Sequence, residues 1–97
     1  MVHQPAVYIL SNKKNGTLYT GVTSNLIQRI WQHKSKLNQG FSKQYDLGKL
    51  VYYELHQDIT EAITREKNIK KWRRQWKIDL IEKQNPNWND LWGQIID

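Results

Sequence analysis

The stretch that decides the fold is AVYILSNKKNGTLYTGVT, residues 6–23, because it contains two predicted strands and the turn between them. Residues 6–11 and 17–23 are rich in aromatic and β-branched side chains, which favour strands. The Asn15-Gly16 pair between them is typical of a two-residue type I′ hairpin turn. With these two residues at the turn, we expect Tyr8 to face Thr23 across the hairpin.

The alternation of side chains along a strand gives this hairpin two different faces. One face is expected to carry Tyr8, Leu10, Tyr19 and Gly21. The other face is the expected core and carries Val7, Ile9, Leu18, Thr20 and Val22. A face with two phenols and a glycine is a place where a ligand or another backbone can approach closely.

The segment after the hairpin predicts a helix. Ser24 or Thr23 can cap its start, and we expect it to extend to about Leu37. The predicted apolar stripe consists of Leu26, Ile30 and Leu37, broadened by Ile27 and Trp31. His33 falls on this stripe, and Arg29 lies at its edge, one turn before His33.

The second half of the chain predicts one more strand and further helices. Residues 50–55 (LVYYEL) form the expected strand, and Asp58 or Thr60 can open the next helix. That helix is expected to bend near residues 73–75, and residues 85–92 (NPNWNDLW) to form a short closing segment. The predicted order is therefore strand, strand, helix, strand, helix, helix.

Length and composition indicate one folded domain, residues 1–97, with its core within about residues 6–92. Hydrophobic residues make up 38% of the chain and charged residues 25%, which is typical of a globular protein. The absence of cysteine excludes a disulfide framework and a thiolate metal site. We find no pattern of a signal peptide and no apolar run of the roughly 18 residues that a membrane span requires, so we expect a cytoplasmic location.

Positive charge is concentrated in one segment of a chain whose net charge is +6. Residues 65–77 (REKNIKKWRRQWK) contain one acid, Glu66, and seven cations: Arg65, Lys67, Lys70, Lys71, Arg73, Arg74 and Lys77. Cations interleaved with aromatic residues favour binding to a polyanion, most simply nucleic acid. An ordinary solvated helix face explains the same charges, and charge alone leaves both interpretations open.

Glu66 is the most unusual residue, because it interrupts the predicted apolar stripe of its helix. That stripe consists of Ile59, Ala62, Ile63, Ile69 and Trp72. A carboxylate on such a face is unfavourable unless it is paired, protonated or bound to a metal ion. Its flanking cations at positions 65 and 67 are expected to point to other faces of the helix.

Each of these polar residues also has an ordinary structural explanation. A strand tyrosine or a helix histidine is more often a packed, hydrogen-bonded residue than a catalyst, and Glu66 can pair with Arg29 across the core. The later tryptophans are expected to pack in the core or at a hinge: Trp72, Trp76, Trp88 and Trp92. Together, however, phenols, an arginine, a histidine and one carboxylate are the ingredients of phosphodiester hydrolysis with a single hard metal ion.

These residues give the chain a specific family resemblance. It resembles GIY-YIG endonuclease domains, most closely the small stand-alone bacterial proteins of that superfamily. Val7-Tyr8-Ile9 stands in the place of the first motif and Tyr19-Thr20-Gly21 in the place of the second. Arg29 and His33 have the family's R-x-x-x-H spacing, and Glu66 stands in the place of the metal-binding glutamate.

The resemblance extends to the end of the chain and to the fold. Pro86-Asn87-Trp88-Asn89 is similar to a late segment that provides an asparagine near the site, which assigns Asn89 that place, with Asn85 and Asn87 as alternatives. The resemblance implies a small α/β (α+β) domain. In such a domain a three-stranded antiparallel sheet is flanked by helices in the order β-β-α-β-α-α.

The resemblance also implies an activity, a divalent-metal-dependent DNA endonuclease. Glu66 would hold one Mg²⁺ or Mn²⁺ ion, and Tyr19, assisted by Tyr8, would be the general base. Arg29 would bind the scissile phosphate, while His33 would orient a tyrosine or share proton transfer. Backbone phosphates would contact Lys67, Lys70, Lys71, Arg73 and Arg74.

The expected partner is DNA. Related nucleases choose their target through an additional domain, for which this chain has no room. We therefore expect the DNA to be recognised by its structure or through a targeting protein. Two alternatives remain open at this point. The first is a nucleic-acid-binding module of the same fold without catalysis. The second is a protein-interaction domain that uses the tryptophans and the basic helix as its surface.

Overall fold

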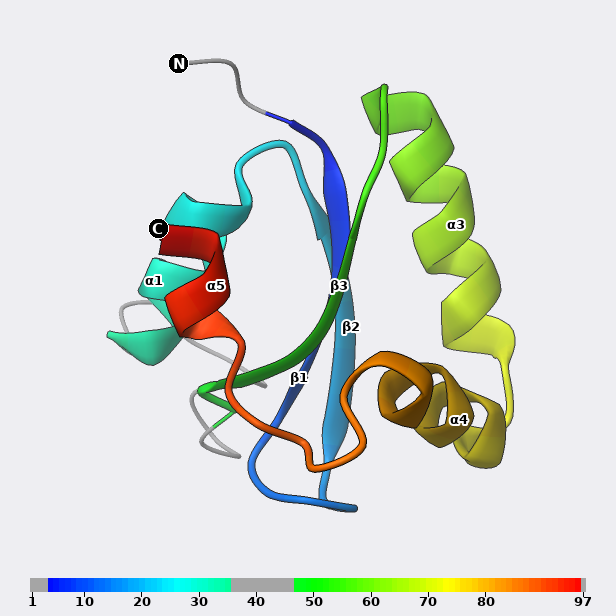
Figure 1. The fold of residues 1–97 in the computed structure, drawn as a ribbon. Coiled ribbons are helices and arrows are strands. Elements are labelled where there is room, and N and C mark those ends of the chain that lie inside the picture. Colours follow the sequence, from blue (N-terminus) through cyan, green and yellow to red (C-terminus); the bar gives the residue numbers. More distant parts are fainter. Residues whose placement is uncertain (1–3, 36–46, 97) are drawn as a thin grey trace.

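The computed structural model describes residues 4–35 and 47–96. They form a three-stranded antiparallel sheet with helices on both faces (Figure 1). The strands are β1 (Ala6–Ser11), β2 (Leu18–Thr23) and β3 (Lys49–Leu55), in the order β2-β1-β3. Helices α1 (Leu26–Lys34) and α5 (Trp92–Ile96) cover one face, and α3 (Ile59–Lys71) and α4 (Arg74–Gln84) cover the other. This confirms the predicted fold class and element order, with α5 added in the closing segment.

The hairpin of β1 and β2 forms with a longer turn than the sequence predicts. Tyr8 faces Gly21 and not Thr23, so the predicted register is wrong by two residues. The strands end at Ser11 and Leu18, because the Asn12 side chain accepts a hydrogen bond from the Thr17 amide at 3.0 Å and closes a wider loop. A shift of two residues preserves the side on which every side chain lies. The predicted composition of the two faces is therefore correct.

Each face of the sheet has its own apolar core. Helices α3 and α4 cover the face of Val7 and Ile9, and the buried members of this core are Val7, Ile9, Val51, Tyr52, Ala62, Ile69, Ile81 and Trp88. Helix α1 covers the face of the tyrosines, where the buried members are Ala6, Tyr8, Leu10, Leu26, Ile30, Leu47 and Leu50. The central strand β1 contributes to both cores, and all its residues are buried.

Helix ends differ from the predicted ones by a few residues. The N-cap of α1 is Asn25, whose side chain accepts a hydrogen bond from the Gln28 amide at 3.2 Å. The predicted end of this helix at Leu37 lies outside the described residues. Asp58 caps α3 as predicted. No helix in the described ranges is long and apolar enough to cross a membrane.

Several apolar side chains that the sequence assigns to the core are exposed: Ile27, Trp31, Ile59, Ile63 and Trp76. The reason is that α1 and α3 each contact the sheet through a narrow stripe. In α3 this stripe is formed by Ala62, Glu66 and Ile69. The predicted bend between α3 and α4 is confirmed, because Trp72 and Arg73 have extended backbone angles.

Candidate active site

The site begins with the position of the Tyr8 ring, which extends across the neighbouring strand over Gly21. A Cβ atom added to Gly21 would lie 2.4 Å from both Cζ and Oη of Tyr8. The phenol therefore occupies the space in which any other residue would place its side chain. Since β2 is an edge strand, this position carries the Tyr8 hydroxyl group from the middle of the sheet toward its edge.

Three rings meet on this face of the sheet. The ring centroids of Tyr8 and Tyr19 lie 6.4 Å apart, and His33 of α1 lies 5.9 Å from the first and 5.6 Å from the second. The Tyr8 hydroxyl group lies 3.3 Å from His33 Nε2, within hydrogen-bonding distance. The two strand tyrosines and the helix histidine that the sequence singles out thus form one cluster.

The environment of this cluster determines its protonation. Burial, aided by the charge of Arg29, lowers the pKa of His33, so its imidazole is neutral at physiological pH. Burial raises the pKa of Tyr8 far above its ordinary value, and the charges of Tyr19 and Glu66 add to this effect, whereas Arg29 opposes it. Tyr8 therefore keeps its proton, and its hydroxyl group and His33 Nε2 share one hydrogen bond. The buried Nδ1 of His33 has no hydrogen-bond partner among the described residues.

Arg29 and Glu66 lie on helices that cover opposite faces of the sheet. Arg29 belongs to α1 and Glu66 to α3, yet the charges of both act on the Tyr8 hydroxyl group. The Glu66 side chain is 10% exposed, and its Oε2 atom lies 2.6 Å from Lys70 Nζ, one helical turn later. The ion-pair partner of Glu66 within the described chain is therefore Lys70, and the alternative pairing with Arg29 is wrong.

An open groove of about 370 Å³ lies beside Tyr19. Residues of β2 form one wall, and Lys70 and Lys77 form the other; the strand residues are Leu18, Tyr19 and Thr20. Tyr19 is only half-buried, so it borders this groove, whereas Tyr8 is buried behind it. The groove thus combines a phenol with two ammonium groups, which suits a phosphate group.

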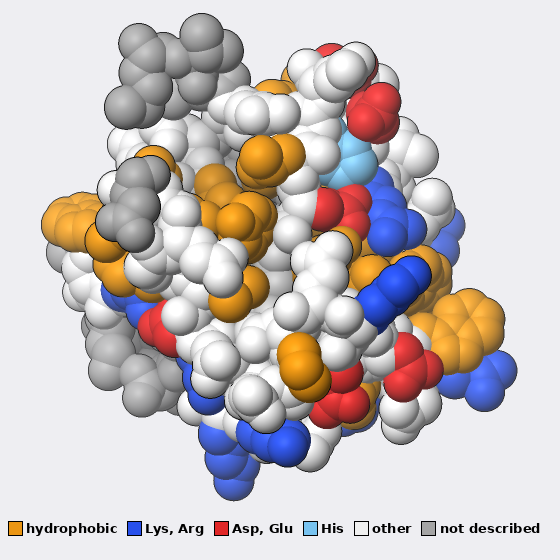
Figure 2. Space-filling model, viewed as in Figure 1, with side chains coloured by type: hydrophobic (Ala, Val, Ile, Leu, Met, Phe, Trp, Pro, Cys, Tyr) orange, Lys and Arg blue, Asp and Glu red, His pale blue; other side chains and the backbone are white. Residues whose placement is uncertain are grey.

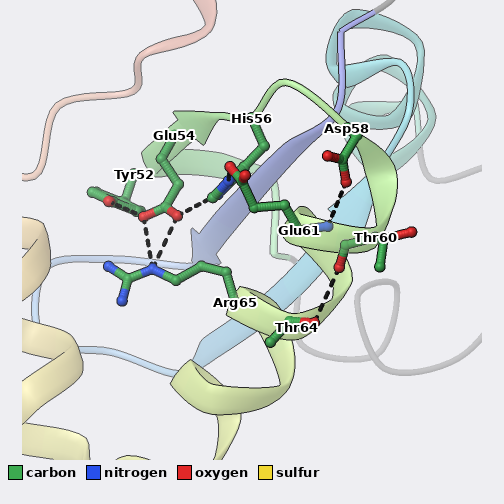
Figure 3. A network of polar contacts seen from close by, with 8 residues as sticks. All are labelled: Tyr52, Glu54, His56, Asp58, Thr60, Glu61, Thr64 and Arg65. Atoms are coloured by element: carbon green, nitrogen blue, oxygen red, sulfur yellow. Dashed lines mark hydrogen bonds and ion pairs between the residues drawn. The ribbon is translucent and has the colours of Figure 1, made fainter.

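A polar network fixes α3, the helix that carries Glu66, against the end of β3 (Figure 3). Glu54 accepts hydrogen bonds from Arg65 Nε at 3.0 and 3.3 Å and from the Tyr52 hydroxyl group at 2.5 Å. His56 lies between Glu54 and Glu61, 2.6 and 2.8 Å from their carboxylates. Arg65 directly precedes Glu66, so this network sets the rotation of the helix at the candidate metal ligand.

The predicted phosphate-binding cations occupy different environments. The described side chains of Lys67, Lys70, Lys71 and Arg73 are exposed. Arg74 is also exposed, but its Nη2 atom donates to the carbonyl oxygens of Asn15 and Gly16 at 2.7 and 2.5 Å, so it supports the hairpin turn. Lys77 borders the same groove as Tyr19 and is not among the predicted site residues; its only signal in the sequence is membership of the basic segment.

Asn89 is not brought to the tyrosine cluster. The segment that contains it follows β3, where the Leu91 amide donates to the Leu50 carbonyl oxygen at 2.8 Å, and β1 separates β3 from β2. Asn89 is exposed, while the neighbouring Asn85 is buried and donates to the carbonyl oxygens of Val51 and Asn89. Asn85 thus has a structural role, and the site role of Asn89 stays a prediction.

The acids present suit only one kind of metal site. No group of three or more potential ligands of the His, Cys, Asp or Glu type occurs among residues 4–35 and 47–96. A protein cage for a metal ion is therefore absent from this part of the chain. A single carboxylate such as Glu66 fits a hard divalent cation that retains most of its water ligands, as Mg²⁺ does.

Comparison with known proteins agrees with this geometry. The family model of the GIY-YIG catalytic domain matches residues 4–79, a range that includes both tyrosines of the cluster and Glu66. The chain belongs to the GIY-YIG family. This family has a nuclease fold, which places the chain among nuclease-like domains.

Related GIY-YIG proteins are small bacterial proteins of similar length. The chain is 38% identical over 78 residues to UPF0213 protein SH2523 of Staphylococcus haemolyticus, covering 80% of this chain and 94% of the relative. It is 42% identical over 83 residues to UPF0213 protein CPE1444 of Clostridium perfringens, covering 81% and 84%. The solution NMR structure of UPF0213 protein BH0048 from Bacillus halodurans shares the fold, with a TM-score of 0.57, 26% identity and coverage of 90% and 92%.

Proposed function

We propose that this protein is a divalent-metal-dependent DNA endonuclease that hydrolyses phosphodiester bonds. The observation that carries the proposal is the cluster of Tyr8, Tyr19 and His33 next to a groove bordered by Lys70 and Lys77. The charges of Arg29 and Glu66 act on the Tyr8 hydroxyl group of this cluster. A base, a phosphate-binding cation and an acid for a hard metal ion are then within reach of one bound phosphate.

Tyr19 is our choice of general base for the attacking water molecule. It borders the open groove, whereas the Tyr8 hydroxyl group is buried and its raised pKa keeps it protonated. Tyr8 and the neutral His33 form a hydrogen-bonded pair behind Tyr19, and this pair orients the base. The guanidinium group of Arg29 binds the scissile phosphate and stabilises the negative charge that accumulates in the transition state.

Glu66 would hold one Mg²⁺ or Mn²⁺ ion. When bound, this ion supplies charge neutralisation at the phosphate and at the leaving oxygen. Lys70, which pairs with Glu66 at 2.6 Å, then exchanges this carboxylate for a phosphate of the DNA backbone. Lys67, Lys71, Arg73 and Arg74 provide further positive charge for the backbone without reading its sequence.

The biological setting that we propose follows from the same site. The lysines of the groove suit contacts to backbone phosphates, which carry no sequence information, so we propose that DNA is selected by its structure or through a targeting protein. We propose a cytoplasmic role in DNA repair or a related step of DNA handling.

Cleavage by purified protein tests the proposal. Wild-type protein is expected to cut flap or branched DNA in Mg²⁺ or Mn²⁺, and Glu66→Gln to lose at least about 100-fold in rate. Glu61→Gln is the matched control, because Glu61 lies on the same helix and also forms an ion pair, but with His56. Equal rates for wild type and Glu66→Gln would refute the assignment of the metal ligand.

A second candidate function is a DNA-binding module without catalysis. The Glu66–Lys70 ion pair favours it, because a carboxylate that is already neutralised needs no metal ion. This candidate predicts that Glu66→Gln binds DNA normally and that the wild type cleaves no DNA in any divalent metal. Metal-dependent cleavage that requires Glu66 would reject it.

A further inference from the structure

Two tryptophans at the junction of α3 and α4 form a surface that the proposed endonuclease site does not use. Trp72 and Trp76 have ring centroids 6.1 Å apart and meet edge to face at 77°. Trp76 is 50% exposed, although tryptophan is the largest apolar side chain. The rings border a shallow pocket of about 280 Å³, which is completed by Asp79, Leu80 and Lys83. We call this the Trp72–Trp76 surface.

One guanidinium group contacts each ring of the Trp72–Trp76 surface. On the side of the molecule where α3 and α4 lie, Figure 2 shows exposed hydrophobic side chains next to Lys and Arg side chains. The guanidinium carbon of Arg65 lies 5.2 Å from the Trp72 centroid, and that of Arg73 lies 4.9 Å from the Trp76 centroid. Such distances are typical of cation–π contacts. The pocket contains one acid, Asp79, and one lysine, Lys83, whose formal charges balance. The guanidinium group over Trp76 therefore leaves the surface with a net positive charge.

Arg65 is already paired with Glu54, so the exposed Trp76 ring and the guanidinium group of Arg73 are the parts that suit a flat, negatively charged ligand. An unpaired nucleotide has both properties, because its base stacks on the ring while its phosphate contacts the cation. Duplex DNA has only the phosphate to offer, since its bases are stacked on one another. Protein interfaces are also rich in Trp and Arg, so self-association through this surface is a separate outcome of the experiment below.

We propose that the Trp72–Trp76 surface stacks an unpaired base of a DNA strand whose neighbouring phosphate lies in the Tyr19 groove. The inference rests on the proposed function and specifies its substrate as DNA with a single-stranded segment. Trp76 and Lys77 are consecutive in α4, so their side chains diverge by about 100°. Lys77 borders the Tyr19 groove and Trp76 borders the surface, so one strand can contact both.

Trp31 provides a matched control for Trp76. It is 51% exposed, and it lies on α1, which covers the opposite face of the sheet. No cation–π contact of Trp31 occurs among the described residues, in contrast to Trp76. Replacement of either exposed ring by alanine removes similar apolar area with little effect on the core, and thermal unfolding would confirm that both variants fold.

The experiment measures the affinity of the full chain for single-stranded oligothymidine and for a duplex of equal length, by fluorescence anisotropy in EDTA. Trp76→Ala is expected to weaken binding to the single strand about 5-fold to 100-fold and to leave duplex binding within twofold. Trp31→Ala is expected to change neither. Because EDTA prevents cleavage, this result does not depend on whether the protein is a nuclease.

Several outcomes would overturn the inference. Equal loss of single-strand and duplex binding in Trp76→Ala would show that the ring acts only through its neighbouring charges. Unchanged single-strand binding would show that no base stacks there. Self-association that Trp76→Ala abolishes, with DNA binding unchanged, would assign the surface to a second copy of the chain. Failure of the proposed function is distinct from these results, because it appears as absence of cleavage by the wild type in Mg²⁺.

Discussion

The position of the Tyr8 phenol over Gly21 makes Gly21→Ala a sharp test of the site geometry. The new Cβ would lie 2.4 Å from Tyr8 Cζ and Oη, far inside normal contact distance. Neither neighbour can move freely, because Tyr8 is 1% exposed and Gly21 belongs to the paired β1–β2 ladder. Overpacking of this kind costs about 1–3 kcal/mol. For a chain of 97 residues, each kcal/mol lowers Tm by about 4–8 °C.

A double-mutant cycle isolates this contact from the general effect of alanine in a strand. Leucine at position 8 does not reach the space over Gly21, so Gly21→Ala in a Tyr8→Leu background is expected to be neutral or slightly stabilising. The coupling free energy between the two positions is then about 1–3 kcal/mol, measured by urea unfolding of the four proteins. The same destabilisation by Gly21→Ala in both backgrounds would refute our account of why this position is a glycine.

Three further predictions concern the supports of the site. Hydrogen bonds to Glu61 and Glu54 raise the pKa of His56 above 6.5. The stability that His56 contributes is therefore fully present below pH 6.5 and is lost as the pH rises through the folded-state pKa. The difference in unfolding free energy between wild type and His56→Gln should therefore shrink from about pH 6 to pH 8, and a difference that grows would contradict the network. Asn85→Ala should lower the free energy of unfolding by about 1–3 kcal/mol, because it leaves the carbonyl oxygens of Val51 and Asn89 without their donor. Asn89→Ala should leave the free energy of unfolding nearly unchanged. The reverse order in urea unfolding would move the structural role to Asn89. Arg74→Ala should lower stability by about 0.5–1.5 kcal/mol, because its guanidinium group supports the hairpin turn; unchanged stability in urea unfolding would contradict this role. Lys77→Ala should weaken DNA binding and reduce its salt dependence by about one counterion; an unchanged salt dependence would exclude Lys77 from the DNA contact.

Much of the fold was accessible from local patterns in the sequence. The alternation of side chains in β1 and β2 predicts that Tyr8 and Tyr19 lie on one face of the sheet and Val7 and Ile9 on the other. The faces are correct because the predicted register differs from the observed one by an even number of residues. Asp58 was identifiable as a cap because its side chain acts on the helix that directly follows it.

The failures concern interactions between distant segments. The Asn15-Gly16 pair predicted a two-residue turn, whereas the Asn12 side chain and Arg74 of α4 stabilise a wider one. Ile59 and Ile63 fitted an apolar stripe, but only the narrow line of Ala62, Glu66 and Ile69 faces the sheet. Such outcomes depend on how closely two elements pack, which periodicity does not encode.

The candidate site could be predicted in composition but not in its connections. Tyr8, Tyr19 and His33 form one cluster, and the charges of Arg29 and Glu66 act on the Tyr8 hydroxyl group, whereas the site roles of these residues stay predictions. The pairing of Glu66 with Lys70 is not among the predictions, although a cation one full helical turn after a carboxylate lies on the same face of the helix. Lys77 was missed because only the break between α3 and α4 turns it toward Tyr19.

The central claim is that the phenols form the reacting part of one site, and the rate of DNA cleavage by Tyr19→Phe tests it most directly. Tyr53→Phe is the control, because Tyr53 is also half-buried on the sheet face of the tyrosines but lies on β3. In single-turnover cleavage of flap DNA with Mg²⁺, we predict a loss of about 100-fold or more for Tyr19→Phe and none for Tyr53→Phe. Equal rates for wild type and Tyr19→Phe, at equal DNA affinity, would contradict the account.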